Sequence, residues 1–549
     1  MNLLYSVANT LIYLHIFAKM LAPFALGVAG FAAVTQENTR RLWLTICWFS
    51  LILFAVVFGG YNLIIQPQIP QAIAFPSSDL IISFLFVCMG AAVWFVYLRS
   101  VHPFLNAESQ KFVKRSAVER NKKTDVRSID QFLPAVPSLF DPSKFFKKGA
   151  FFLGLGEGDK PIYFEQETLP HTQILGTSGA GKGVLLGAIA AQCLRAGEAV
   201  FWLDPKDDEW APFVLQKSAL DANKPFVLID LRPSAPPQIN LFENSTPGQI
   251  EELFLAGFSL TEKGTESDFY SIEDRWAASL VAADYKDGDT PASLLARHQE
   301  LADTAKKFFG LLREMAQIQS VNAKSGFDLR NVVRDGGAVY VIGSMRNAKV
   351  IRLQRMLNVK IIQLCEERDR TNGKPRAVCA ILDEVKYHLS KPFLEGLGAA
   401  RDKGLHIVLA HQSLADLKDC PADLNAEAVV GAVMENCALK IVYRVEDPLT
   451  AEWMARKSGR IQVDDEVRRV TKNAGFAEIV NPERQMRQAE RFLIDENLIL
   501  NLRKSQAVVF GTGIAKFIST SPIQVKKTAD TLKIQGVAGD KIITAADLI

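Results

Sequence analysis

The chain has 549 residues, of which 63 are basic and 60 acidic, so its formal net charge is only +3. This length predicts more than one domain, with enough residues for a large core. The near balance of charge excludes a protein that is basic throughout, so any surface for DNA must be a local patch.

The N-terminal part predicts a membrane domain over residues 1–105. The runs 42–65 and 80–98 carry no charged residue, and each is long enough to span a bilayer. The run 11–34 is interrupted by His15 and Lys19, so it is either a third span or a helix in the membrane interface. No Lys or Arg precedes this run, which disfavours a cleaved signal peptide.

Basic residues predict the orientation of these spans. Arg40 and Arg41 precede the first uncharged run and Arg99 follows the second, whereas the connecting segment 66–79 has neither Lys nor Arg. The positive-inside rule therefore places that segment outside and everything after about residue 100 in the cytoplasm. Residues 106–150 are predicted to be a basic juxtamembrane linker and the start of the soluble part. The basic stretch 111–127 contacts anionic lipid or DNA in one interpretation and is a solvated linker in the other.

The remainder predicts an α/β fold. Short apolar runs such as "EAVFWLD" and "AVCAILDE" alternate with amphipathic segments over 151–246 and 326–549, which indicates a mainly parallel sheet with helices on both faces. Residues 247–325 contain helical patterns with no strand pattern between them, so they are predicted to be an inserted all-α subdomain.

A glycine-rich segment, "GTSGAGKG" at 176–183, lies between a predicted strand and a predicted helix. Such a loop wraps its N–H groups around phosphate at the helix N-terminus, and Lys182 would reach the β- and γ-phosphates of ATP. The usual pattern ends in Ser or Thr, which binds Mg²⁺, but here it ends in Gly183. The predicted nucleotide-binding residues are Gly176, Thr177, Ser178, Gly179, Ala180, Gly181, Lys182, Gly183 and Val184.

Two further strands end in polar residues. Asp383 and Glu384 follow "AVCAIL", where a carboxylate lies beside the phosphate loop in this architecture. Asp383 is predicted to hold Mg²⁺ through water, and Glu384 to polarise the attacking water. Gln412, at the end of "LHIVLAHQ", would sense the γ-phosphate or orient water.

The cysteines do not predict a metal site. They lack C-x-x-C spacing and most lie in apolar runs, which is typical of reduced core residues rather than of disulfides or zinc ligands. The histidines are also dispersed. The seven cysteines are Cys47, Cys88, Cys193, Cys365, Cys379, Cys420 and Cys437.

The chain resembles the type IV secretion coupling proteins, the VirD4/TraG/TraD group of membrane-anchored DNA-pumping ATPases. The resemblance covers nearly the whole chain and is carried by the N-terminal spans and the helical insertion, and by the segments "GTSGAGKGV", "FWLDPKDDEW", "INLFE", "ILDEV", "GAARDKGLHIVLAHQSLADL" and "ENCALKIVYRVEDPLTAEWMARKSG". Many members of this group also have Gly at the position of Gly183. The segment "DPK" has Asp207 where the group usually has glycine, so the sequence leaves the local turn undefined.

The resemblance implies a RecA-like P-loop ATPase that uses ATP and Mg²⁺ and is anchored in the bacterial inner membrane. It implies a homo-hexamer with nucleotide sites between subunits, a channel for non-specific, single-stranded DNA, and delivery of a relaxase–DNA complex or effector proteins to a secretion channel. Arg401 stands where the group has an arginine thought to reach the neighbouring subunit's γ-phosphate, and Arg444 is a second candidate. Asn436 matches a recurring polar position that has no assigned role.

Two alternatives stay open from the sequence. One is a membrane receptor or scaffold that binds nucleotide but scarcely hydrolyses it, which the missing hydroxyl at Gly183 favours. The other is a DNA translocase of the FtsK/HerA type, which the helical insertion and the "DPK" segment disfavour.

Overall fold

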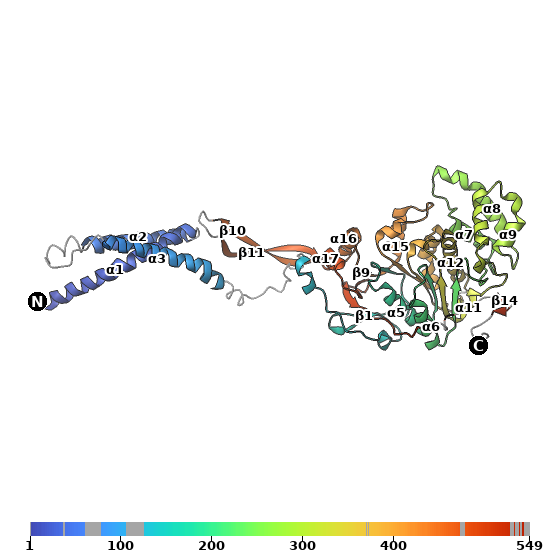
Figure 1. Cartoon of the computed structure of the whole chain (residues 1–549), viewed down its shortest axis with the longest axis horizontal. Coiled ribbons are helices and arrows are strands. Elements are labelled where there is room, and N and C mark those ends of the chain that lie inside the picture. The colour runs from blue at the N-terminus through green and yellow to red at the C-terminus, as the bar shows by residue number, and fades with distance from the viewer. Residues whose placement is uncertain are drawn as a thin grey trace. The chain divides into compact units, whose positions relative to one another are not determined.

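The computed structural model describes residues 2–36, 39–60, 78–105, 126–368, 371, 373–472 and 478–527, together with 532, 537–538 and 541–542 (Figure 1). The chain divides into two compact units, Met1–Asn121 with Gln462–Ala489, and Lys122–Ile461 with Glu490–Ile549. The segment 66–77 of the predicted outer loop and most of the basic stretch 111–127 lie outside the described residues.

The first unit contains long apolar helices. They are α1 (Asn2–Thr35), α2 (Arg40–Gly60) and α3 (Ser78–Val96), and a π-helical turn over Tyr97–Val101 follows α3. By length and composition, three described segments could cross a membrane, Ala18–Thr35, Arg40–Val57 and Ile81–Leu105. The N-terminal run with His15 and Lys19 is therefore part of a third helix of spanning length.

Glycines let α1 and α3 approach closely. A Cβ on Gly27 would lie 2.0 Å from the carbonyl oxygen of Val87, and one on Gly90 would lie 2.2 Å from that of Phe24. Small residues at such contacts are typical of helix packing in membranes. Trp94 of α3 also donates a hydrogen bond from Nε1 to Thr35 Oγ1 at 3.2 Å.

The second unit is built on an eleven-stranded sheet with the order β2-β1-β13-β12-β9-β3-β8-β7-β4-β6-β5. The strands from β9 to β5 are parallel, whereas β12, β13, β1 and β2 add an antiparallel edge. The predicted α/β fold with a mainly parallel sheet is confirmed, and the runs "EAVFWLD" and "AVCAILDE" form the parallel strands β4 and β7. The sequence did not predict the antiparallel edge. The strands are β1 (Phe151–Leu155), β2 (Pro161–Phe164), β3 (Thr172–Leu175), β4 (Ala199–Asp204), β5 (Phe226–Asp230), β6 (Gly337–Ile342), β7 (Val378–Leu382), β8 (Leu405–His411), β9 (Leu439–Tyr443), β12 (Gln506–Phe510) and β13 (Lys516–Ser519).

Strands outside this sheet form small two-stranded sheets. One consists of β10 (Arg460–Lys472) and β11 (Glu478–Phe492), and the other of β14 (Val537–Ala538) and β15 (Lys541–Ile542).

Successive strand residues point to opposite sides of the large sheet, so both of its faces are apolar, and helices cover both. In β4, Phe201 and Leu203 join one buried cluster, while Val200 and Trp202 join another on the other face. The helices of this unit are α5 (Lys182–Arg195), α6 (Ala211–Asp221), α7 (Pro247–Phe258), α8 (Ile272–Ala283), α9 (Pro291–Arg297), α10 (Lys306–Ala316), α11 (Leu329–Asp335), α12 (Ala348–Glu366), α13 (Lys391–Ala399), α14 (Leu414–Lys418), α15 (Ala426–Asn436), α16 (Pro448–Lys457) and α17 (Glu496–Leu500).

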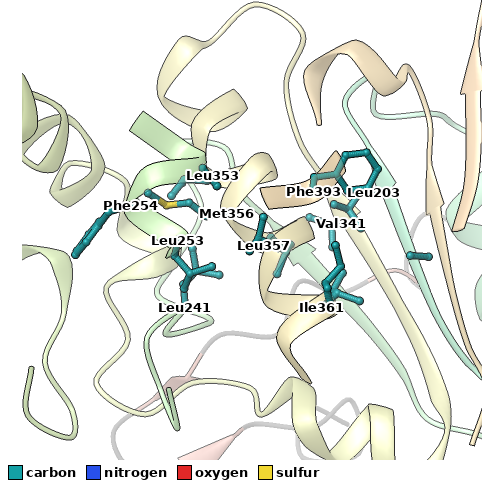
Figure 2. Packing of buried hydrophobic residues seen from close by; sticks show 14 of the residues in the cluster. Leu203, Leu241, Leu253, Phe254, Val341, Leu353, Met356, Leu357, Ile361 and Phe393 are labelled. Carbon is teal, nitrogen blue, oxygen red and sulfur yellow. The ribbon is translucent and has the colours of Figure 1, made fainter. Parts of the chain in front are cut away.

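The segment between β5 and β6 is described throughout and contains helices but no strand. Its helices share one hydrophobic core with the sheet. Figure 2 shows Leu203 and Val341 of the sheet, Leu357 of α12 and Phe254 of α7 in that core. The all-α insertion predicted over 247–325 packs through α7 on α12, which follows β6, and its boundaries stay a prediction.

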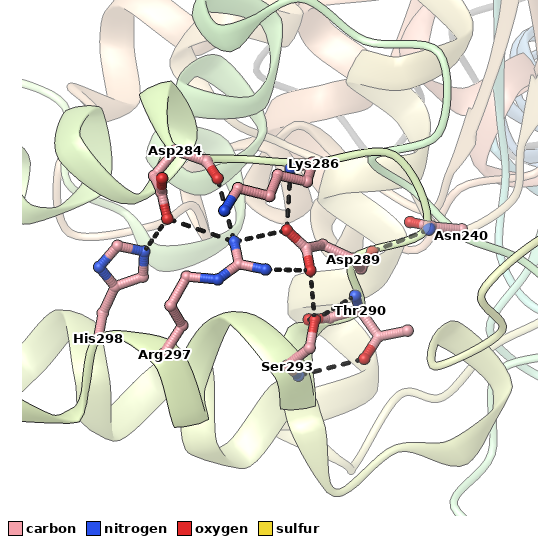
Figure 3. Close-up of polar contacts among 8 residues, drawn as sticks. All are labelled: Asn240, Asp284, Lys286, Asp289, Thr290, Ser293, Arg297 and His298. Atoms are coloured by element: carbon pink, nitrogen blue, oxygen red, sulfur yellow. Dashed lines mark hydrogen bonds and ion pairs between the residues drawn. The ribbon is translucent and has the colours of Figure 1, made fainter.

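Polar contacts fix the outer part of this helical segment (Figure 3). Arg297, at the end of α9, bonds both carboxylate oxygens of Asp289, at 2.5 and 2.6 Å, and Asp284 Oδ2 at 3.3 Å. Asn240 donates to the backbone oxygen of Asp289 at 3.0 Å. The bidentate pair with Asp289 and the contact with Asp284 connect the end of α9 to the turn that precedes this helix.

Candidate nucleotide-binding site

The loop 176–181 has the backbone shape of a phosphate cradle. Gly176, Gly179 and Gly181 have φ values of 153°, 76° and 125°, which residues with a Cβ rarely adopt. A Cβ on Gly176 would also lie 2.6 Å from the Cβ of Tyr443 in β9. The loop therefore requires glycine for both backbone conformation and space.

Backbone hydrogen bonds hold the loop at the carboxyl edge of the sheet. The N–H of Gly176 donates to the carbonyl of His411 at 3.2 Å, and the N–H of Thr177 donates to that of Arg444 at 2.8 Å. These carbonyls come from the ends of β8 and β9, which flank β3. In a parallel α/β sheet this edge is where ligands bind.

The ammonium group of Lys182 lies inside the loop. It donates to the carbonyl oxygen of Gly176, and to that of Thr177 at 3.3 Å, and the residue is only 6% exposed. Burial lowers the pKa of Lys182, and the nearby carboxylates of Glu384 and Asp383 oppose that effect. The loop thus presents a cation at its centre, with Gly179 and Ser178 exposed at its rim.

Four successive strands bring the site together. The order β3-β8-β7-β4 places the glycine loop, Gln412, the acidic pair and Lys206 at the ends of adjacent strands. Lys206 Nζ contacts Glu384 Oε1 and lies 3.6 Å from Asp383 Oδ2. Gln412 Nε2 donates to Glu384 Oε1 at 3.3 Å.

The two carboxylates have different environments. Glu384 is 3% exposed, and although burial would raise its pKa, the hydrogen bond and charge of Lys206 and the charge of Lys182 lower that pKa below its usual value. Burial raises the pKa of Asp383 to about 6, with Lys206 opposing. Neighbouring acids with pKa values moved in opposite directions are typical of functional sites.

Glu384 also has an unusual backbone conformation. Its φ and ψ are 48° and 66°, in the left-handed region, without the freedom of glycine. The N–H of Glu384 bonds to Asp383 Oδ1 at 3.0 Å, and the carbonyl of Asp383 accepts from His388 Nε2 at 3.1 Å. Strain of this kind persists where the surroundings fix a side chain in place.

The sequence did not single out Lys206 as a site residue. The turn that carries it is built on Asp204, whose carboxylate accepts from the N–H groups of Lys206 and Asp208 at 2.8 and 2.7 Å. Asp207, in the position of the expected glycine, has a φ of 59° and an ion pair with Arg232 at 2.6 Å. Aspartate tolerates this conformation better than most residues, so the departure from glycine preserves the turn.

The remaining predicted residues are Gln412, Arg401, Arg444 and Asn436, and only some of them lie beside the loop. Gln412 is exposed, and its N–H is fixed by Asp416 Oδ2 at 2.8 Å. Arg401 precedes β8 and lies at the opposite edge of the sheet, so this chain does not bring it to its own loop. The exposed Arg444 follows β9 beside the loop, whereas Asn436 bonds within its own helix to Ala432 O at 2.8 Å.

Gly183 and Val184 lie in the first turn of α5, directly after its first residue, Lys182. Gly183 is exposed, and a Cβ built on it would meet no described atom within 4 Å. The helix start therefore has room for a hydroxyl side chain at this position.

The sheet order and this loop geometry define a P-loop NTPase fold. The polar groups at the loop are the ammonium groups of Lys182 and Lys206 and the carboxylates of Asp383 and Glu384.

Residues 302–534 match the family described as Type IV secretory system Conjugative DNA transfer, which confirms the resemblance of the chain to the type IV coupling proteins. The chain is 31% identical over 325 residues to Mobilization protein A of Escherichia coli, and the alignment covers 58% of this chain. It spans 60% of the length of that relative.

The chain is also similar to solved structures of conjugative coupling proteins. The bacterial conjugative coupling protein TrwBdeltaN70 superposes with a TM-score of 0.50 at 16% identity, over 72% of this chain and 95% of that chain. The plasmid coupling protein TrwB in complex with ADP and Mg²⁺ gives a TM-score of 0.49 at 15% identity, over 73% and 95% of the two chains.

Proposed function

We propose that the chain is an inner-membrane coupling ATPase, which recruits a relaxase–DNA complex or effector proteins and delivers them to a type IV secretion channel. The observation that carries the enzymatic part is the convergence of Lys182, Lys206, Asp383, Glu384 and Gln412 on one glycine loop. The matched conjugative DNA transfer family and the membrane-length helices support the rest.

The residues present fit ATP and Mg²⁺. The loop offers backbone N–H groups, and Lys182 can exchange its two carbonyl partners for phosphate oxygens. Mg²⁺, when bound, would neutralise phosphate charge, and Asp383 is the carboxylate that would hold it, through water. Since Gly183 has no hydroxyl, the protein would hold the ion mainly through Asp383.

Glu384 is suited to act as the general base. Its lowered pKa keeps it ionised at neutral pH, so it can accept a proton from the attacking water. Lys206 and Gln412 fix its carboxylate from two sides. We propose that Gln412 couples the position of Glu384 to the γ-phosphate, because it directly follows β8, the strand between β3 and β7, and its side chain is exposed.

An arginine from another subunit would complete the site. Arg401 is exposed and remote from its own loop, which suits a role at a neighbouring subunit's nucleotide in a homo-hexamer. Arg444 remains the alternative within the same subunit. Single-stranded DNA would be bound without sequence preference, through its phosphates.

A nucleotide-binding receptor with little turnover is the second candidate. The ion pair between Lys206 and Glu384 restrains the base in the absence of nucleotide, and Gly183 withholds one metal ligand. In that case the site would bind ATP without hydrolysing it under any partner condition.

Purified full-length protein in detergent distinguishes these functions. ATP binding and ATP hydrolysis are measured separately, with and without single-stranded DNA. We expect Lys182→Ala to lose binding and hydrolysis, and Glu384→Gln to retain binding but lose hydrolysis. Lys217→Ala, at an exposed lysine of α6, is the matched control. Binding without turnover in every condition favours the receptor, and wild-type protein that binds no nucleotide refutes both.

A further inference from the structure

A second polar cluster lies inside the sheet, away from the glycine loop. Cys379 of β7 and His406 of β8 are register partners on adjacent parallel strands, so their side chains lie on the same face. Cys193, on the last turns of α5, covers them from above. One ligand atom from each of these three residues lies within 4.8 Å of the other two.

A carboxylate completes the cluster. Glu198, between α5 and β4, places Oε2 at 2.6 Å from His406 Nε2. Its N–H donates to the carbonyl of Cys193 at 3.0 Å, and its side chain also interacts with the Cys193 thiol. Glu198 therefore lies beside the group of Cys193, Cys379 and His406, in contact with its histidine.

The cluster is buried, and two of its polar atoms have no hydrogen-bond partner in the part of the protein that the structure describes. Cys193 and Cys379 are fully buried, and Glu198 and His406 are each 3% exposed. His406 Nδ1 and Glu198 Oε1 have no hydrogen-bond partner among the described residues. The Glu198 carboxylate is paired with His406 through Oε2, so Glu198 Oε1 and His406 Nδ1 are the buried positions at which a further partner would be favourable.

We propose that Cys193, Cys379, His406 and Glu198 bind a thiophilic divalent cation, with Zn²⁺ as the first candidate. Two thiolates, an imidazole and a carboxylate are ligands that Zn²⁺ accepts in tetrahedral sites. Zn–S bonds of about 2.3 Å separate two sulfur ligands by about 3.8 Å, so small side-chain movements suffice from distances within 4.8 Å. Binding replaces the thiol protons and the proton shared between His406 and Glu198, and these leave to solvent.

A cavity lies beside the cluster on the side of Glu198. Its volume is about 700 Å³, and Gln192, Glu198 and Ala377 are among its lining residues. These residues are Glu198 itself and close chain neighbours of Cys193 and Cys379. The site would join the end of α5 to β7 and β8, so its role would be structural and independent of nucleotide chemistry.

The spacing of the cysteines along the chain predicts reduced core residues and not this metal site. The four ligands come from separate elements and are joined only by the order of the strands. A local Cys motif therefore could not reveal them.

Metal analysis of the full-length protein in detergent tests the proposal. Protein purified without chelator should contain about one zinc ion per chain, and metal-depleted protein titrated with Co²⁺ should show a thiolate-to-cobalt absorption band. Cys379→Ser and Cys193→Ser should lose the band, whereas Cys365→Ser, at another buried cysteine, should retain it.

Glu198→Gln provides a variant that preserves side-chain size. It should weaken Co²⁺ binding by about tenfold or more. Wild-type protein with neither stoichiometric zinc nor a cobalt band would overturn the proposal, and so would a band that persists unchanged in both cysteine variants. If the serine variants do not fold, the wild-type spectrum and the Glu198→Gln titration decide the question.

Discussion

Replacing Asp383 by asparagine should stabilise the nucleotide-free protein while it removes function. Burial raises the pKa of Asp383 from 3.8 to about 6, with the charge of Lys206 opposing. The folded protein therefore tolerates the ionised form less well than the unfolded chain does, by about 3 kcal/mol above about pH 7. Asparagine avoids this cost, and its amide oxygen can still accept the Glu384 N–H that Asp383 Oδ1 accepts at 3.0 Å.

The sign of the pH dependence follows from the raised pKa. The cost is absent when the carboxyl group is protonated in both states, below about pH 3, grows between the two pKa values, and is complete above about pH 7. The Tm of Asp383→Asn should therefore exceed that of wild type by roughly 5 °C at pH 8, and the difference should shrink at pH 5. Thermal unfolding of the full-length protein, followed by intrinsic fluorescence, measures this. Asp221→Asn on α6 is the control, because that aspartate is exposed.

A variant that is less stable than wild type at pH 8 would contradict this reasoning. A stability difference that does not change with pH would also contradict it, because the ionised form of Asp383 would then cost the folded protein no stability. In either case, a loss of Mg²⁺-dependent ATP affinity in Asp383→Asn would be attributed to misfolding and not to the missing carboxylate.

Three further outcomes are expected. Gly183→Ser should leave ATP affinity unchanged or raise it up to about tenfold in the presence of Mg²⁺, because its Cβ enters open space and its hydroxyl gains a charged partner; isothermal titration with and without Mg²⁺ checks this. Gly176→Ala should lose ATP binding by more than about tenfold, since its Cβ meets Tyr443 and its φ is unfavourable; retained affinity would mean that the loop is not built as described. Lys206→Gln removes the partner that lowers the pKa of Glu384, so the acid limb of the ATPase pH profile should move to higher pH, and an unmoved limb would separate Lys206 from the base.

The parallel core of the fold could be read from the sequence because its strands are buried on both faces. Strands such as β4 and β7 are continuous apolar runs of a length that helices rarely have. The antiparallel edge gave a weaker signal. Strand β13 begins with exposed Lys516, and β2 begins with a proline, so neither forms a distinct apolar run.

The candidate site could also be predicted only in part from the sequence. The glycine loop is a local motif, and Asp383 and Glu384 end a strand that is easily recognised. Lys206 becomes part of the site only because β4 lies next to β7, which is a property of strand order and not of spacing along the chain. Arg401 lies away from the loop because it precedes β8, whereas the loop lies at the edge of the sheet where β8 ends.

The most direct test of the account is a DNA-transfer assay in a deletion strain complemented with wild-type protein or with Lys182→Ala. We predict that the variant reaches wild-type levels in the membrane, by immunoblot, and fails to support transfer, because its loop can no longer hold the phosphates of ATP. Transfer at the wild-type frequency by Lys182→Ala would contradict the claim that this site powers the protein.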